Sequence, residues 1–190
     1  MVDSRGSQWT RRSVTTAALA SVVGLAVDRP AAAVVIMRQR GMAGGGLVRL
    51  EEGRANLSLV ATRLILPEDA GEFVVGSVRW VASGGPSLAS TAVTGYDQLP
   101  SSAGEEGRRI RGTMSVDGAG DYPFVLDVFD AGPPGSGKDR LVLAVGDAIV
   151  PEAGATPTPP SDDGFGYAAA GMLATGDFQD VDFDIETGAG

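Results

Sequence analysis

The sequence predicts an all-β protein: an antiparallel β-sandwich with an Ig-like or jelly-roll-like pair of sheets and about eight or nine strands. Two observations support this fold class. Apolar and polar residues alternate with a period of two along most of the chain after residue 33, as in strands with one buried face. Glycine and proline are abundant, with 28 and 11 residues among 190, and they cluster between the alternating segments as turn residues do.

The alternating segments give the expected strands in chain order. They are residues 55–62, 73–80, 109–116, 122–129 and 141–145. Between them stand turn signals such as Gly44-Gly45-Gly46, Gly84-Gly85-Pro86 and Asp117-Gly118. Short turns between strands of this length favour antiparallel neighbours.

The end of the domain departs from this rhythm. Residues 151–163 are rich in proline and lack apolar periodicity, which predicts a surface loop. Residues 166–186 then predict a closing hairpin that turns at Gly176-Asp177. In its second strand, Val181, Phe183 and Ile185 are expected to face the core. The alternating acids Asp180, Asp182 and Asp184 would form either a solvated face or an acidic strip that binds a partner.

Residues 1–33 predict a twin-arginine-like signal peptide ahead of a single domain over residues 34–190. Arg11-Arg12 precedes a short apolar run, and Ala31-Ala32-Ala33 supplies the small residues of a cleavage site. The run is shorter than the ~20 residues that span a bilayer, so no transmembrane anchor is expected after cleavage. We therefore expect a secreted protein, extracellular or in the cell envelope; an amphipathic helix of a cytosolic protein is the alternative.

Composition excludes several kinds of chemistry. The chain has no cysteine and no histidine, which rules out disulfides, a thiolate nucleophile, a Ser-His-Asp relay and a Cys/His zinc site. A formal net charge of -9 argues against nucleic acid as a partner, because phosphate binding needs a basic surface. No carboxylate stands in an apolar stretch that would raise its pKa, so the sequence predicts no catalytic acid and no enzyme activity.

The segment Gly132–Asp139 partly matches a phosphate-binding loop. The match fails at Asp139, where the loop needs a hydroxyl for magnesium and where a carboxylate would repel phosphate. The residues that follow alternate as a strand instead of starting a helix. We therefore expect a hairpin loop here and no nucleotide partner.

Calcium is the one cofactor that the sequence admits. Asp127, Asp130 and Asp139 surround the same glycine-rich hairpin, whose carbonyl groups could complete a shell of oxygen ligands. The alternative is that these aspartates cap ordinary turns. The aromatic residues leave a similar choice between a platform on which sugars stack and part of the hydrophobic core. They are Trp80, Tyr96, Tyr122 and Tyr167.

Several segments resemble a secreted bacterial β-sandwich family, the post-choice-of-anchor domains of cell-surface proteins. They include Gly44–Leu47, Gly53–Leu59, Gly76–Trp80, Ile110–Gly118, Tyr122–Leu141 and Gly166–Asp177, and the resemblance covers about residues 42–186. It implies a secreted sandwich module and supplies no catalytic residue. Residues 151–163 are longer than the turn that this resemblance implies.

These observations favour a non-catalytic, exported β-sandwich module that acts by interaction or structural support at the cell surface or beyond it. Its partner is unknown and could be a glycan. Two alternatives stay open: a calcium-dependent carbohydrate-binding module, and a glycan hydrolase that uses a pair of carboxylates.

Overall fold

The computed structural model describes residues 38–66, 71–100, 105–148 and 165–184. Contacts divide the chain into two units, residues 1–33 and 34–190, and every described residue belongs to the second. The predicted signal peptide and the Pro-rich loop lie outside the described residues. In the described ranges no helix has the length and apolar character needed to cross a membrane.

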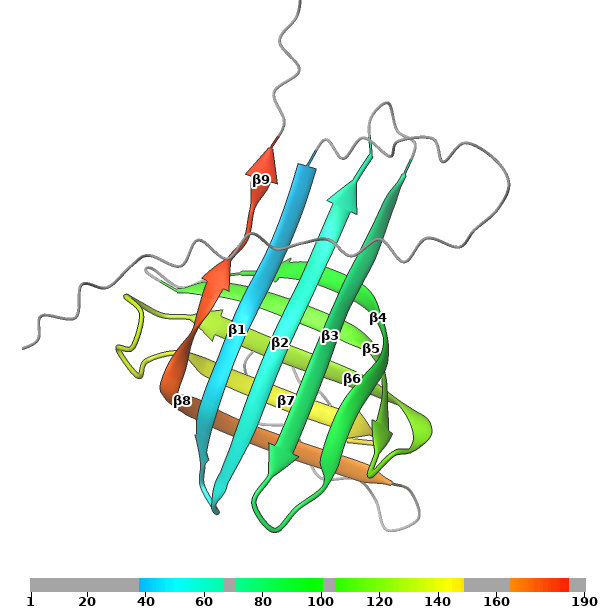
Figure 1. Ribbon diagram of the computed structural model, residues 1–190, viewed down its shortest axis with the longest axis vertical. Coiled ribbons are helices and arrows are strands. Elements are labelled where there is room, and N and C mark those ends of the chain that lie inside the picture. The colour runs from blue at the N-terminus through cyan, green and yellow to red at the C-terminus, as the bar shows by residue number, and fades with distance from the viewer. Residues whose placement is uncertain (1–37, 67–70, 101–104, 149–164, 185–190) are drawn as a thin grey trace, which may run out of the picture. The chain divides into compact units, whose positions relative to one another are not determined.

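The described strands form one antiparallel sheet that closes into a barrel (Figure 1). They are β1 (Arg38–Leu50), β2 (Arg54–Ile65), β3 (Glu72–Ala82), β4 (Ser87–Leu99), β5 (Glu106–Val116), β6 (Ala119–Asp130), β7 (Arg140–Gly146), β8 (Gly166–Asp180) and the short β9 (Phe183–Asp184). Each strand from β1 to β7 pairs with the next, and β8 pairs back with β1. The predicted two-sheet sandwich is therefore wrong, because the ladders run round a full ring of eight strands.

Glycines let β1 approach both of its neighbours closely enough to close this ring. A Cβ on Gly45 would lie 2.2 Å from the Leu57 carbonyl oxygen of β2, and one on Gly46 would lie 1.9 Å from the Thr175 oxygen of β8. On β8, a Cβ on Gly176 would lie 2.0 Å from the Gly45 oxygen. These glycines lie inside strands, so the turns that the sequence predicted at Gly44–Gly46 and Gly176 are wrong. They serve instead as points where the sheet bends.

The predicted closing hairpin is a single strand of 15 residues, β8. Leu173 and Phe178 both lie in the core although they are five positions apart, and the pairing of β8 with β1 shifts between Leu47 and Val48. This irregularity moves even-numbered positions to the inner face, since a shift of one residue exchanges the two faces of a strand. As a result, Asp180 turns inward and Phe183 is 55% exposed, the reverse of the predicted orientation.

Apolar side chains fill the barrel. The bulkiest fully buried ones are Trp80, Phe178, Met42, Leu59, Leu88, Ile110, Met114 and Leu126. Trp80 donates a hydrogen bond from Nε1 to the Tyr167 hydroxyl at 3.0 Å, which satisfies its polar atom within the core. Trp80 and Tyr96 are core residues and Tyr122 and Tyr167 pack against the core, so the four rings form no exposed platform on which sugars could stack. An eight-stranded barrel is just wide enough to be packed in this way, which leaves its ends for binding.

Candidate functional site at the barrel mouth

At one end of the barrel the inward-facing positions become polar. There a pocket of about 310 Å³ is lined by Arg40, Arg63, Ile65, Tyr96, Gln98, Glu106, Arg108 and Asp182. We call these residues, together with Asp180, the mouth. They continue the inner faces of their strands: Arg63 and Ile65 follow Ala61 at a spacing of two, and Arg108 precedes Ile110. The barrel wall thus positions each of them.

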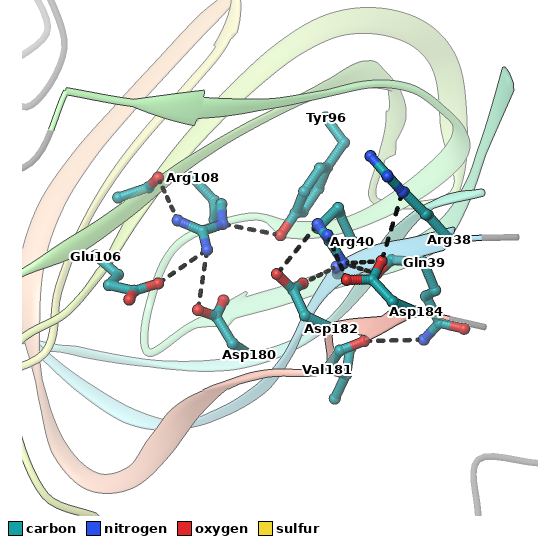
Figure 2. Close-up of polar contacts among 12 residues, drawn as sticks. Arg38, Gln39, Arg40, Tyr96, Glu106, Arg108, Asp180, Val181, Asp182 and Asp184 are labelled. Atoms are coloured by element: carbon teal, nitrogen blue, oxygen red, sulfur yellow. Dashed lines mark hydrogen bonds and ion pairs between the residues drawn. The ribbon is translucent and has the colours of Figure 1, made fainter. Parts of the chain in front are cut away.

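Arg108 organises the mouth (Figure 2). It is only 5% exposed, and its guanidinium donates from Nε to the Tyr96 hydroxyl at 3.1 Å. Nη2 donates to both Glu106 Oε2 and Asp180 Oδ2 at 2.9 Å. Nη1 donates to the Gly107 carbonyl at 3.1 Å. Because the guanidinium is planar, these bonds fix a phenol and two carboxylates around one cation.

Asp180 and Glu106 are also hydrogen-bonded to each other. Burial and this bond raise the pKa of Asp180 to about 7, whereas the same bond and Arg108 lower the pKa of Glu106. Asp180 is therefore the acid of the pair that keeps its proton to the higher pH, and in that form it can donate to Glu106. Burial also raises the pKa of Tyr96, so its hydroxyl stays neutral. The alternation of acids pointed to Asp180 but not to its inner-face position, because that position depends on the irregular pairing of β8.

Arg40 neutralises the two acids that follow Asp180, which are Asp182 and Asp184. Arg40 donates from Nη2 to Asp184 at 2.9 Å, and its Nε lies 3.6 Å from Asp182. Asp182 also accepts a hydrogen bond from the Gly41 backbone at 3.0 Å, and Arg40 lowers the pKa of Asp184. Both side chains nevertheless stay exposed, at 37% for Asp182 and 51% for Asp184, so the prediction of a solvated face is confirmed for these two acids, while Asp180 turns to Arg108.

The lining of the pocket therefore combines hydrogen-bond donors and acceptors. Arg63 makes a two-pronged ion pair with Glu72 of β3 at 2.8 and 2.6 Å. The positive charge that Arg63 brings to the pocket is therefore also neutralised. Gln98 adds an amide group, and Ile65 adds an apolar wall. Such a lining offers hydrogen bonds of both kinds without a strong net field of either sign.

The structure separates Asp127 from the other two predicted calcium ligands. Asp127 is buried and accepts bonds from Arg109 Nε and Nη2, both at 2.7 Å. Asp130 lies three residues further along β6 and so faces the other side of the sheet. Asp139 is 3% exposed and accepts from the backbone of Ala131 and of Phe178, each at 3.1 Å.

The acid that lies beside Asp139 is Asp177 of β8, and not the predicted ligand Asp127. Burial and the charge of Asp139 raise the pKa of both Asp130 and Asp177. Across the part of the chain that the structure describes, no group of three or more Asp and Glu side chains is arranged to hold a metal ion. Calcium binding stays a prediction, and a comparison of the melting temperature in calcium and in EDTA tests it.

The segment Gly132–Asp139 connects β6 to β7, which are antiparallel neighbours. The interpretation of this segment as a hairpin loop is therefore confirmed. The buried carboxylate of Asp139 ties the loop to β8 through the Phe178 amide.

Sequence analysis identified Tyr96, Asp180 and Asp182 but not the arginines that hold them. A usable signal was present. Glu106 and Arg108 share a strand face with Ile110 and Met114, so they are charged residues on a face that is otherwise apolar. A charge at the end of such a face marks the place where a core meets solvent.

Comparisons of the chain with family models, with curated proteins and with solved structures find no match. The resemblance to post-choice-of-anchor domains stays a prediction, and the function has to be inferred from the mouth.

Proposed function

We propose that the chain is an exported, non-enzymatic binding module whose mouth holds a small, neutral, hydroxyl-rich ligand, such as a sugar unit of a cell-surface or extracellular glycan. The observation that carries this proposal is the combination of guanidinium, carboxyl, phenol and amide groups that line one pocket of about 310 Å³.

The charges of the mouth favour a neutral ligand. Arg40, Arg63 and Arg108 each pair with at least one carboxylate, so neither an anion nor a cation meets an uncompensated partner. A hydroxyl group both donates and accepts, and it can bond to a carboxylate and a guanidinium at once. The pocket volume lies at the lower end of the range for small-ligand sites, which suits one or two sugar rings.

Glycan hydrolysis is the second candidate, because an acid with a pKa of about 7 could protonate a leaving group. The geometry favours binding over this reaction. Glycosidases hold their carboxyl groups about 5–10 Å apart with the scissile bond between them. Asp180 and Glu106 bond directly to each other and to one nitrogen of Arg108, which leaves no space between them. Turnover on a polysaccharide panel that is lost in Asp180→Asn would overturn the binding proposal.

A glycan array followed by calorimetric titration of the strongest hit tests the ligand class. Asp182→Asn removes a charged acceptor that lines the pocket, and we expect it to weaken binding by about tenfold or more, the value of one charge-assisted hydrogen bond. Asp121→Asn is the matched control, because Asp121 is an exposed acid of β6 outside the mouth. It should bind as tightly as the wild type. Unchanged affinity in EDTA would separate this proposal from a calcium-dependent module.

Export is tested separately. We expect Arg11→Lys with Arg12→Lys to keep the protein inside the cell, and N-terminal sequencing of protein from the medium to begin near residue 34. Full-length protein in the cytosol of wild-type cells would contradict export without affecting the argument for the mouth.

A further inference from the structure

Strand β3 has an edge that the barrel leaves largely unpaired. Its ladder with β4 covers only Arg79–Val81, opposite Ser87–Ala89. Beyond this point β4 has irregular pairing with β5 between Ser90 and Ala92 and again between Val93 and Gly95. Figure 1 shows β4 turning away from β3 there. The first half of β3 therefore has a strand neighbour, β2, on one side only among the described residues.

The backbone groups at this edge belong to Glu72, Val74 and Gly76. In an antiparallel sheet, successive residues direct their backbone groups to opposite neighbours. Two contacts show which residues of β3 direct their backbone groups toward β4: Ala82 N donates to the Pro86 oxygen, and Val78 N donates to Ser90 Oγ. Even-numbered residues thus face the β4 side. No described strand pairs with the first three of them on that side.

The residues between them are apolar and exposed. Phe73 and Val75 are 41% and 46% exposed on the outer face of β3. The segment Glu72–Ser77 contains no lysine and no proline, the residues that usually prevent edge strands from pairing. Phenylalanine and valine also have high strand propensity.

We propose that β3 pairs with β3 of a second copy of this chain, antiparallel and about a two-fold axis at Val74. This register places Glu72 opposite Gly76, Val74 opposite Val74, and Gly76 opposite Glu72 of the other copy. Each of the three residues whose backbone groups face the open edge then lies opposite another such residue in the other copy. On the outer face, Phe73 of each copy lies opposite Val75 of the other.

The register is self-complementary in three ways. It uses only the backbone groups that face the open edge and leaves the Val78–Ser90 contact intact. It makes two aromatic–aliphatic cross-strand pairs, a favourable combination. It also places Glu72 across from glycine, which leaves room for the carboxylate that Arg63 holds. Self-complementarity about a two-fold axis is what a closed dimer requires.

Sedimentation velocity of the folded chain over a concentration series tests the proposal. We expect a monomer–dimer equilibrium in the wild type. Val74→Pro removes an edge N–H without touching the β2 ladder, which uses odd-numbered residues, and proline is tolerated at a strand edge. We expect it to raise the dissociation constant at least tenfold. Met172→Lys is the control, because Met172 is 48% exposed on β8, a strand that pairs with β1 and β7 and not with β3.

Cysteine cross-linking tests the register and does not depend on the stability of the proline variant. The chain has no cysteine of its own. Phe73→Cys mixed with Val75→Cys places the two Cα atoms about 4.5 Å apart across the axis, within disulfide range. Either variant alone leaves equivalent residues about 7–8 Å apart, too far to bridge. Oxidation should therefore cross-link the mixture much faster than either variant alone.

A wild type that stays monomeric at the highest concentration would overturn the proposal, whether or not an added extended peptide binds to the edge. A dimer that Val74→Pro leaves intact, or one that cross-links equally in all three cysteine samples, would place the interface elsewhere. The proposal is independent of the mouth and of its ligand.

Discussion

At the scale of single residues, Asp180 dominates the chemistry of the chain. No histidine is present, so few side chains can change charge near neutral pH. Asp180 faces Glu106 and Arg108 from β5 and lies near Asp182. Burial and the carboxyl neighbour outweigh Arg108, which is why its pKa rises to about 7 despite the ion pair. Sequence patterns gave the acid but not its environment, because that environment comes from strands more than 70 positions apart.

Stability is expected to fall as the pH rises from about 5 to 8. The unfolded chain releases the Asp180 proton near pH 4, whereas the folded chain keeps it to about pH 7. Between these pH values the folded state binds more protons than the unfolded state does. The free energy of unfolding therefore decreases as the pH rises. Glu106, whose pKa is lowered, gives the opposite trend, but only below about pH 4.5.

Urea denaturation at pH 5 and pH 8 measures this effect. Asp180→Asn should flatten the difference in midpoint, and Asp121→Asn, which changes an exposed acid, should keep it. If Asp180→Asn retained the full pH dependence, the proton would reside on another group, such as the half-buried Asp130 or Asp177.

At the scale of strands, period-two alternation located β2, β3, β5, β6 and β7 well. It failed where the backbone is irregular. In β4, two irregularities in its pairing with β5 disturb the alternation between Leu88 and Tyr96. In β1 and β8, glycines that look like turn residues are required because neighbouring backbones approach closely. Local pattern cannot distinguish these two uses of glycine, since the second depends on a partner strand distant in sequence.

Gly176→Ala compared with Gly53→Ala separates the two uses. The φ angles are nearly equal, +100° and +98°, so the backbone strain of an alanine should be similar, about 1–2 kcal/mol. Nothing lies within 4 Å of a Cβ at Gly53, whereas one at Gly176 meets a carbonyl oxygen at 2.0 Å. We expect Gly176→Ala to cost about 1–3 kcal/mol more in urea denaturation, the usual range for overpacking. Equal costs would mean that the β1–β8 contact relaxes freely.

At the scale of the described unit, the sequence predicted an all-β structure but did not predict that the sheet closes into a barrel. A sandwich and a barrel share alternating strands, short turns and an apolar interior. They differ in whether the first and last long strands pair, and no local feature reports that pairing. Here β8 meets β1 over nine residue pairs, from Met42–Asp180 to Leu50–Gly171.

A closed ring predicts cooperative unfolding of the barrel. Each strand from β1 to β8 has a partner on both sides along at least part of its length, so losing one strand exposes two others. In a Trp9→Phe variant, the fluorescence of the buried Trp80 and the circular dichroism of the sheet should change at the same urea concentration. Separate midpoints for the two signals would show that part of the ring opens independently.

The pairing of β1 with β8 also sets an order of events during synthesis. β1 leaves the ribosome before every other described strand, and the last of its long partners follows about 120 residues later, which is on the order of 10 s of translation. Until then, one side of β1 can bond only to water or to the wrong chain. The nascent protein is therefore most prone to aggregate just before residue 180 emerges, and slower elongation lengthens that period.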